Sequence, residues 1–201
     1  EGKIFLMPNI WAAISRLAEP ERGLQAMESV SRYLLKDYGT LLNFPAFTKP
    51  RSDIGYVTRY APGLRENGGV YTHAATWSVW AYALMNQPEL AYEAYRRICP
   101  PNRSADIERY WAEPYVTPGN IDGPQSEFYG RGGWTWYTGS VQWLHYVATH
   151  WILGIRPREE GLLVDPSIPA EWKGFKVKRT FRNAIYFINV KNPNHVSKGV
   201  K

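Results

Sequence analysis

The chain has 201 residues, 44% of them hydrophobic, and its 24 Lys and Arg against 18 Asp and Glu give a net charge of +6. This length and composition allow a buried core in one or two domains and exclude a disordered chain. No apolar run reaches the roughly 18 residues of a membrane-spanning helix. We therefore expect no membrane segment. Positive residues are scattered except between Lys173 and Arg182, so we also expect no nucleic-acid partner.

Cysteine usage and the two ends of the chain bear on its location. The single cysteine, Cys99, cannot form an internal disulfide, so nothing indicates an oxidising compartment. The start, Glu1 to Leu6, resembles neither a signal peptide nor a start with Met, and the chain stops soon after a strand-like run. We therefore expect a cytoplasmic protein, and a chain cut from a longer one.

The spacing of apolar residues predicts two consecutive helices near the start of the chain. The first begins around Asn9 and includes Leu17, and the second begins at Pro20, because proline is favoured as the first helical residue. Residues 37–62 contain several prolines and glycines without a sustained period. They predict a long ordered loop, a kind of segment that often carries function.

Further helices are expected after this loop. Residues 77–84 place apolar side chains on one helical face, and residues 90–98 supply an antiparallel partner. A second long loop is expected over 102–133. The last long helix is marked by Val141, Leu144, Ala148 and Trp151 and ends at Gly154 as a C-terminal cap.

The apolar period then changes from helical to strand-like. Strands are expected over 162–165, 175–181 and 184–190. The sequence therefore predicts a mainly α chain with a helical part over 1–156 and a β part over 157–201.

Two loop-to-helix junctions share an unusual composition. Gly68-Gly69 precedes Thr72 and His73, and Gly132-Gly133 precedes Thr138-Gly139-Ser140. Backbone N–H groups and hydroxyls at the start of a helix suit an anion, and two such junctions suggest one shared cavity. Ordinary helix capping by Thr and Gly is the alternative at each junction taken alone.

Glu66 and His73 are the titratable groups nearest the first junction. Glu66, flanked by Arg65 and Asn67, could accept hydrogen bonds from sugar hydroxyls, act as an acid or base, or pair with a cation. His73 could bind a ligand or be a satisfied structural histidine. The other histidines show no metal-ligand spacing with it, so no metal is expected.

Several strings share one family resemblance. They are Arg65-Glu66-Asn67-Gly68-Gly69, Thr72-His73, Glu113-Pro114-Tyr115, Thr138-Gly139, Ile152-Leu153-Gly154-Ile155-Arg156-Pro157, Asp165-Pro166-Ser167-Ile168-Pro169 and Trp172-Lys173-Gly174-Phe175. From about Gly2 to its end the chain resembles the C-terminal part of glycoside hydrolase family 94. These are the inverting β-glycan phosphorylases, formerly classed with the glycosyltransferases.

Two longer strings resemble one part of that family. They are Tyr60-Ala61-Pro62-Gly63 and the run from Gly130 to Tyr137. That part includes β-1,2-oligoglucan phosphorylases, cellobionic acid phosphorylases and the phosphorylase-like domain of cyclic β-1,2-glucan synthases. Cellobiose and chitobiose enzymes are expected to be more distant.

The resemblance implies the end of an (α/α)6 catalytic barrel followed by the start of a C-terminal β-sandwich. It also implies phosphorolysis of a β-linked gluco-oligosaccharide to α-glucose 1-phosphate, with inorganic phosphate as co-substrate and no other cofactor. A homodimer is a further expectation. The family's general acid, an Asp, is expected upstream of Glu1. The fragment alone is therefore expected to be inactive.

The resemblance also assigns roles to single residues. It implies that His73, Thr138 and Gly139 bind phosphate and that Glu66 and Arg65 bind substrate, with Glu66 in the donor-sugar subsite. Tyr56 and Trp136 are expected on the acceptor side together with Arg59 and Trp134. A structural role is the alternative for the two tryptophans.

Two other functions stay open. The chain could belong to the transglycosylating or cyclising domain of a β-1,2-glucan synthase, which phosphate would not drive. It could also be a non-catalytic carbohydrate-binding remnant, because the general acid is expected outside it.

Overall fold

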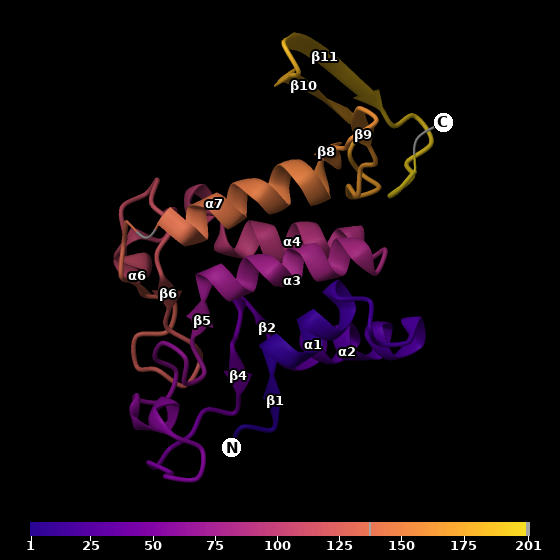
Figure 1. Ribbon diagram of the computed structural model, residues 1–201. Helices are drawn as coiled ribbons and strands as arrows, with labels where there is room; N and C mark the ends of the chain where they lie inside the picture. The colour runs from indigo at the N-terminus through magenta and orange to yellow at the C-terminus, as the bar shows by residue number, and fades with distance from the viewer. Residues whose placement is uncertain (137, 200–201) are drawn as a thin grey trace.

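Packed helices form the central layer of the molecule (Figure 1), and the computed structural model describes residues 1–136 and 138–199. The α-helices are α1 Leu6–Ile14, α2 Pro20–Tyr33, α3 Thr72–Leu84, α4 Pro88–Ile98, α5 Pro100–Arg103, α6 Ile107–Tyr110 and α7 Thr138–Tyr146. A 3-10 helix, η1, covers Tyr56–Arg59, and a π-helix, η2, covers Val147–Ile152. Within these ranges no helix is both long and apolar enough to cross a bilayer.

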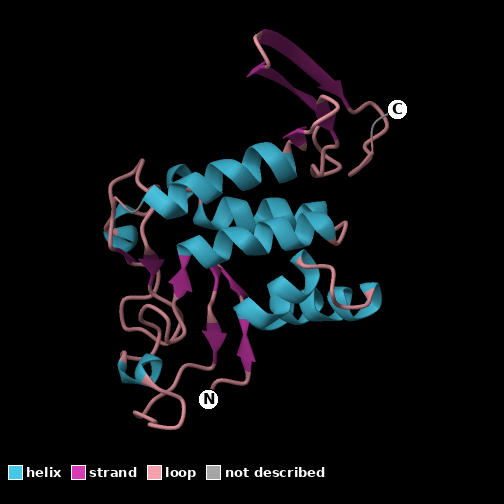
Figure 2. Ribbon diagram, viewed as in Figure 1, coloured by secondary structure: helices cyan, strands magenta, loops and turns pink. Residues whose placement is uncertain are grey.

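Short strands lie between the helices, and strands β8 to β11 follow the last helix (Figure 2). They are β1 Ile4–Phe5, β2 Leu35–Lys36, β3 Gly39–Thr40, β4 Asn43–Phe44, β5 Val70–Tyr71, β6 Asn120–Ile121, β7 Gly132–Gly133, β8 Ile155–Pro157, β9 Leu162–Val164, β10 Gly174–Phe181 and β11 Ala184–Lys191. All the sheets have two strands apart from β5-β6-β7, which has three. The fold is mostly helical with small sheets, as the sequence predicts.

Helix α3 is the centre of the helical layer, where it packs against α1, α4 and α7 (Figure 1). Its buried residues are mostly small: Thr72, Ala74, Ala75, Thr76, Ser78, Val79, Ala81, Tyr82 and Ala83. Small side chains allow neighbouring helices to approach closely, and a helix that is apolar on all sides is stable only when surrounded. The composition of α3 therefore determines its central position.

The two predicted N-terminal helices are confirmed, but the first ends earlier than expected. Helix α1 ends at Ile14, and Arg16 takes a left-handed backbone with φ +58°, which stops the helix. Leu17 lies beyond that point and is 89% exposed, so its assignment to the apolar face was wrong. The predicted long loop over 37–62 is interrupted by short strands and by η1.

The last long helix is less regular than its sequence suggests. It is α-helical up to Tyr146 and then widens into η2. Val141, assigned to the apolar face, is 47% exposed, whereas Val147 and Ile152 are buried. The predicted C-terminal cap is confirmed because Gly154, with φ +70°, follows η2.

The predicted C-terminal strands are also confirmed. β10 and β11 form an antiparallel hairpin whose register pairs Phe181 with Ala184, so the turn is Arg182-Asn183, and both turn residues have positive φ as a two-residue hairpin turn requires. β8 pairs with β9, and an ion pair of 2.6 Å between Arg156 and Asp165 spans this pair. The boundary between 1–156 and 157–201 stays a prediction, and β8 crosses it.

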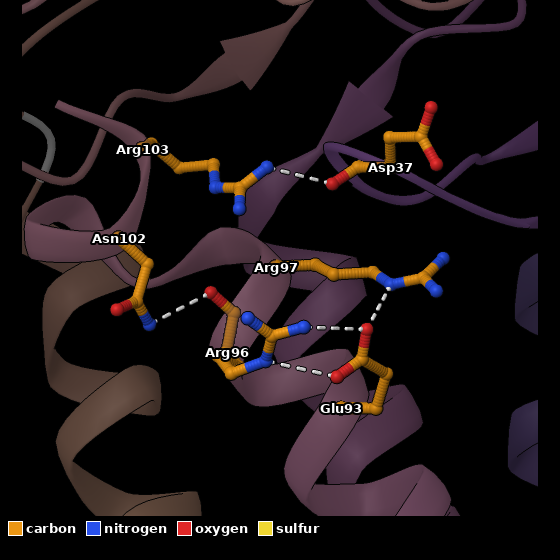
Figure 3. Close-up of polar contacts among 6 residues, drawn as sticks. All are labelled: Asp37, Glu93, Arg96, Arg97, Asn102 and Arg103. Carbon is orange, nitrogen blue, oxygen red and sulfur yellow. Dashed lines mark hydrogen bonds and ion pairs between the residues drawn. The ribbon is translucent and has the colours of Figure 1, made fainter. Parts of the chain in front are cut away.

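A polar network stabilises the C-terminal end of α4 (Figure 3). Glu93 accepts hydrogen bonds from Arg96 and Arg97, at 2.8 to 3.0 Å. Asn102 donates to the carbonyl oxygen of Arg96, and Arg103 donates to that of Asp37 in the turn between β2 and β3. These contacts satisfy a helix-end carbonyl and fix the start of the long loop that follows.

Gly154 tests how closely η2 packs on the strand pair. A Cβ there would overlap the carbonyl oxygen of Asp165. We expect Gly154→Ala to lower the free energy of unfolding by about 2 to 4 kcal/mol, measured by urea unfolding with tryptophan fluorescence. Gly154→Asn should cost as much, because Asn accepts positive φ but also carries a Cβ. Recovery of stability in the Asn variant would contradict the steric explanation.

Candidate functional site

The three-stranded sheet brings the two predicted junctions together. β5 leads directly into α3, β7 lies shortly before α7, and β6 pairs with both, through Val70 with Ile121 and Ile121 with Gly132. The sheet continues in loop hydrogen bonds, because Gly119 accepts from the backbone N–H of Thr72 at 3.0 Å. The N-termini of α3 and α7 therefore lie side by side, each with a partial positive charge.

His73 lies against the first turn of α7. A Cβ added to Gly139 would be 3.6 Å from Nδ1 of His73. Two residues predicted to bind the same anion, 66 positions apart in the chain, are thus neighbours. Thr138 is the first residue of α7, but its side chain lies outside the described part of the chain.

Two tryptophan rings pack around the imidazole of His73. The ring centroid of Trp77 is 4.8 Å from that of His73, and the centroid of Trp143 is 6.1 Å away. Burial lowers the pKa of His73, which favours the neutral imidazole near pH 7. A neutral imidazole has one N–H donor, and Nε2 of His73 is buried with no hydrogen-bond partner among the described residues.

The side chain of Asn67 fixes the loop that carries Arg65 and Glu66. Its amide exchanges hydrogen bonds with the backbone of Phe47, at 2.7 and 2.8 Å, and donates to the carbonyl of Tyr60 at 2.8 Å. This anchoring gives the loop one conformation although it has little regular structure.

Arg65 and Glu66 are direct neighbours in this loop. Nε of Arg65 is 3.6 Å from Oε2 of Glu66, which is too long for a hydrogen bond. Oε2 is buried and has no hydrogen-bond partner within the described chain. The guanidinium of Arg65 also lies over the rings of Tyr60 and Trp134, with centroids at 4.8 and 4.7 Å. The loop before β5, which carries Arg65 and Glu66, therefore meets the loop after β7 through side chains as well as backbone.

Tyr56 and Trp136, both predicted on the acceptor side, are each 65% exposed. The ring of Tyr56 meets that of Tyr60 edge-on at 5.4 Å. Nε1 of Trp136 donates to Glu113 at 2.9 Å, and this contact joins two strings of the sequence resemblance. Both rings are available to a ligand and are held in place by loop neighbours.

Asp122 is a buried carboxylate that the sequence reading placed only in a loop. Its side chain is 2% exposed, and it accepts hydrogen bonds of 3.1 Å from Arg131 and Ser126. Burial raises the pKa of Asp122, against the opposing effect of Arg131. Nothing in the sequence indicated this burial, which depends on packing between loops. That packing is close, because a Cβ at the adjacent Gly123 would overlap the carbonyl oxygen of Gly68.

The described residues contain no group of three His, Cys, Asp or Glu side chains placed to hold a metal ion. The chemistry on hand is instead a pair of helix N-termini, a neutral imidazole, an arginine and a carboxylate. Such a set suits an anion beside a polyhydroxylated ligand.

Comparison with known families agrees with this chemistry. Residues 1–154 match the model described as "Glycosyl hydrolase 94 superfamily, catalytic domain". The chain belongs to this family. The resemblance read from the sequence strings is therefore confirmed.

Individual relatives align with 94 to 100% of the chain. The N,N'-diacetylchitobiose phosphorylase of Vibrio proteolyticus is 42% identical over 201 residues, which is 100% of this chain and 25% of that protein. The cyclic beta-(1,2)-glucan synthase of Rhizobium meliloti is 38% identical over 195 residues, 94% of this chain and 7% of that protein. The cellobionic acid phosphorylase of Neurospora crassa is 31% identical over 198 residues, 96% of this chain and 25% of that protein.

These identities correct one expectation within the family. Chitobiose phosphorylases were expected to be more distant than cellobionic acid phosphorylases, but their identity to this chain is higher, 42% against 31%. Short loop strings were a poor guide because they report few positions. The chain spans about a quarter of the length of these family 94 phosphorylases.

Asp122 gives a pH-dependent prediction. Because its folded pKa lies above the ordinary 3.8, its contribution to stability is complete below that pH and is lost as pH rises through the raised value. Asp122→Asn cannot ionise. The unfolding free energy of the variant relative to wild type should therefore increase between about pH 4 and 7 in urea titrations.

Asp53→Asn is the matched control, because Arg51 holds the pKa of the exposed Asp53 below its usual value. Its difference from wild type should stay nearly flat between about pH 4 and 7, because a lowered pKa confines its pH dependence to lower pH. A flat or falling difference for Asp122→Asn would contradict the cost of burying that charge.

Proposed function

We propose that the chain is part of an inverting phosphorylase that cleaves a β-linked gluco-oligosaccharide with inorganic phosphate and releases α-glucose 1-phosphate. The observation that supports this proposal most is the position of His73 at the paired starts of α3 and α7, where a Cβ on Gly139 would lie 3.6 Å from Nδ1 of His73. Phosphate needs N–H donors and positive potential in a confined place, and both are present there.

The reaction balances with one protein carboxyl group. An oxygen of phosphate forms a bond to the anomeric carbon from the face opposite the leaving group, and the glycosidic C–O bond breaks. The leaving oxygen takes a proton from a general acid, which we place on an Asp outside residues 1–201. Phosphate replaces the base-activated water of an inverting hydrolase, so no second catalytic carboxylate is required.

We assign phosphate binding to His73, Thr138 and Gly139. The neutral imidazole offers one N–H, the backbone of Gly139 belongs to the first turn of α7, and the hydroxyl of Thr138 is assigned from the family resemblance. The positive ends of both helices supply most of the attraction for the dianion, because the imidazole itself carries no charge near neutral pH.

Glu66 is proposed to bind the donor sugar. Its side chain is 31% exposed, Oε2 has no hydrogen-bond partner among the described residues, and its negative charge favours the oxocarbenium-like transition state. Arg65 would bind the same sugar, and Tyr56 and Trp136 would stack on the acceptor, where their exposed faces suit a sugar ring.

The architecture and setting belong to the same proposal. The helices would form the last part of an (α/α)6 barrel, and residues 157–201 would begin a C-terminal β-sandwich. We place the protein in the cytoplasm, with inorganic phosphate as co-substrate and no other cofactor, and propose that a homodimer forms.

A second candidate is transglycosylation in a glucan synthase. The 38% identity to the cyclic beta-(1,2)-glucan synthase of Rhizobium meliloti favours it. That reaction would use a sugar hydroxyl where the first proposal uses phosphate.

The deciding assay is sugar 1-phosphate release by the full-length protein with and without phosphate. Substrates are β-1,2-, β-1,3- and β-1,4-linked gluco-oligosaccharides, cellobionic acid and N,N'-diacetylchitobiose. We expect phosphate-dependent release, and His73→Ala should raise the KM for phosphate about tenfold or more while oligosaccharide binding changes little. His145→Ala, an exposed histidine of α7, is the control. Glycan rearrangement without phosphate would favour the synthase reaction, and sugar binding without any turnover would favour a non-catalytic remnant.

Glu66→Gln tests the donor-sugar role. The substitution keeps the shape and removes the charge, so kcat should fall about a hundredfold on each substrate that the wild type uses. Steady-state kinetics with Glu108→Gln, an exposed carboxylate on α6, provide the comparison. Normal turnover by Glu66→Gln would exclude this role.

A further inference from the structure

Arg65 and Trp134 share an uncommon backbone conformation. Their φ angles are +51° and +57°, in the left-handed region that favours glycine. They belong to different loops, since Arg65 lies before β5 and Trp134 directly follows β7. Residues with large side chains adopt this conformation only where surrounding contacts hold it, and such places cluster at functional sites.

The two strained residues contact each other. The guanidinium of Arg65 lies 4.7 Å from the ring centroid of Trp134 and 4.8 Å from that of Tyr60. Stacking of this kind holds the guanidinium plane while its N–H groups, which lie in that plane, stay free to donate. The side chain of Arg65 is 33% exposed, so some of these donors are accessible.

Glu66 lies next to this contact. Arg65 approaches Oε2 of Glu66 to 3.6 Å, so it acts there as a nearby charge and leaves the hydrogen-bonding capacity of that oxygen unused. Two rings thus fix a cation beside a carboxylate whose buried oxygen has no hydrogen-bond partner among the described residues. Fixed opposite charges with free donors and acceptors can each bind one of two adjacent hydroxyls on a sugar ring.

We propose that Trp134 is a positioning residue for the donor sugar: its indole holds Arg65 beside Glu66 so that the pair together receives the sugar hydroxyls. This rests on the proposed function, because it places the donor sugar at Glu66. Trp134 is also tied to the sheet through its carbonyl oxygen, which accepts from the N–H of Gly119 at 2.9 Å. The loop leading to the phosphate helix therefore sets the geometry of the sugar subsite.

The test uses Trp134→Leu, Trp134→Phe and Trp111→Leu in the full-length protein. Trp134 is 53% exposed and Trp111 is 64% exposed, so neither change empties a core. Trp111 has the same left-handed backbone, with φ +49°, so Trp111→Leu is the matched control for Trp134→Leu. Melting temperatures within a few degrees of wild type verify that each variant is folded.

We expect Trp134→Leu to lower kcat/KM for the oligosaccharide about tenfold, with the KM for phosphate unchanged within about twofold. Trp134→Phe should recover most of the loss because it keeps an aromatic face. Trp111→Leu should behave as wild type. Equal behaviour of Trp134→Leu and Trp111→Leu, or an equal loss for phosphate and oligosaccharide, would overturn the assignment.

Failure of the proposed function gives a different result. In that case the wild-type protein releases no sugar phosphate, and calorimetric binding of the same oligosaccharide becomes the readout. Weaker binding by Trp134→Leu than by Trp111→Leu still supports the positioning role. Equal affinity of the two variants overturns it.

Discussion

The hydrogen bonds of the short sheet β5-β6-β7 are the constraint on which the candidate site depends. Strands of two residues carry little stability themselves, but they fix the distance and register between the start of α3 and the start of α7. Both helix N-termini then face one place, and the loops before them must pack within the remaining space. A glycine at position 123 meets that requirement, because only a residue without Cβ allows its close approach to Gly68.

An aromatic layer below the site gives His73 its environment. Trp80 stacks on Trp143 at 6.1 Å and on Trp151 at 5.2 Å, while Trp77 meets Trp11 edge-on at 5.3 Å. Such pairs contribute about 0.5 to 1.5 kcal/mol each beyond the area they bury. Trp77 and Trp143 pack against the imidazole, and burial lowers the pKa of His73. Much of the aromatic excess of the sequence therefore serves the core, and the exposed rings near the loops are the part available to a ligand.

The sequence predicted the parts of the candidate site that follow from local chemistry. The two loop-to-helix junctions, with their glycines, hydroxyls and His73, could be predicted as an anion site because free backbone N–H groups at a helix start bind anions. The sequence could not indicate Asp122, whose burial depends on packing between two loops, nor the contact of Arg65 with Trp134, which are 69 positions apart. Leu17 was predicted in the first helix because the spacing of apolar residues does not show where a helix ends.

The same limit explains the segment after α7, where a strict period of 3.6 residues fails. In η2 each turn accommodates an additional residue, so the angular position of every later side chain is rotated relative to an ideal α-helix. That rotation brings Trp151 onto Trp80 and sets the direction in which β8 leaves the helix. The angular offset therefore sets the orientation of the C-terminal strands relative to the helical layer. An insertion or deletion of one residue within 147–152 would rotate these strands about the helix axis, whereas the same change in a surface loop would be absorbed locally.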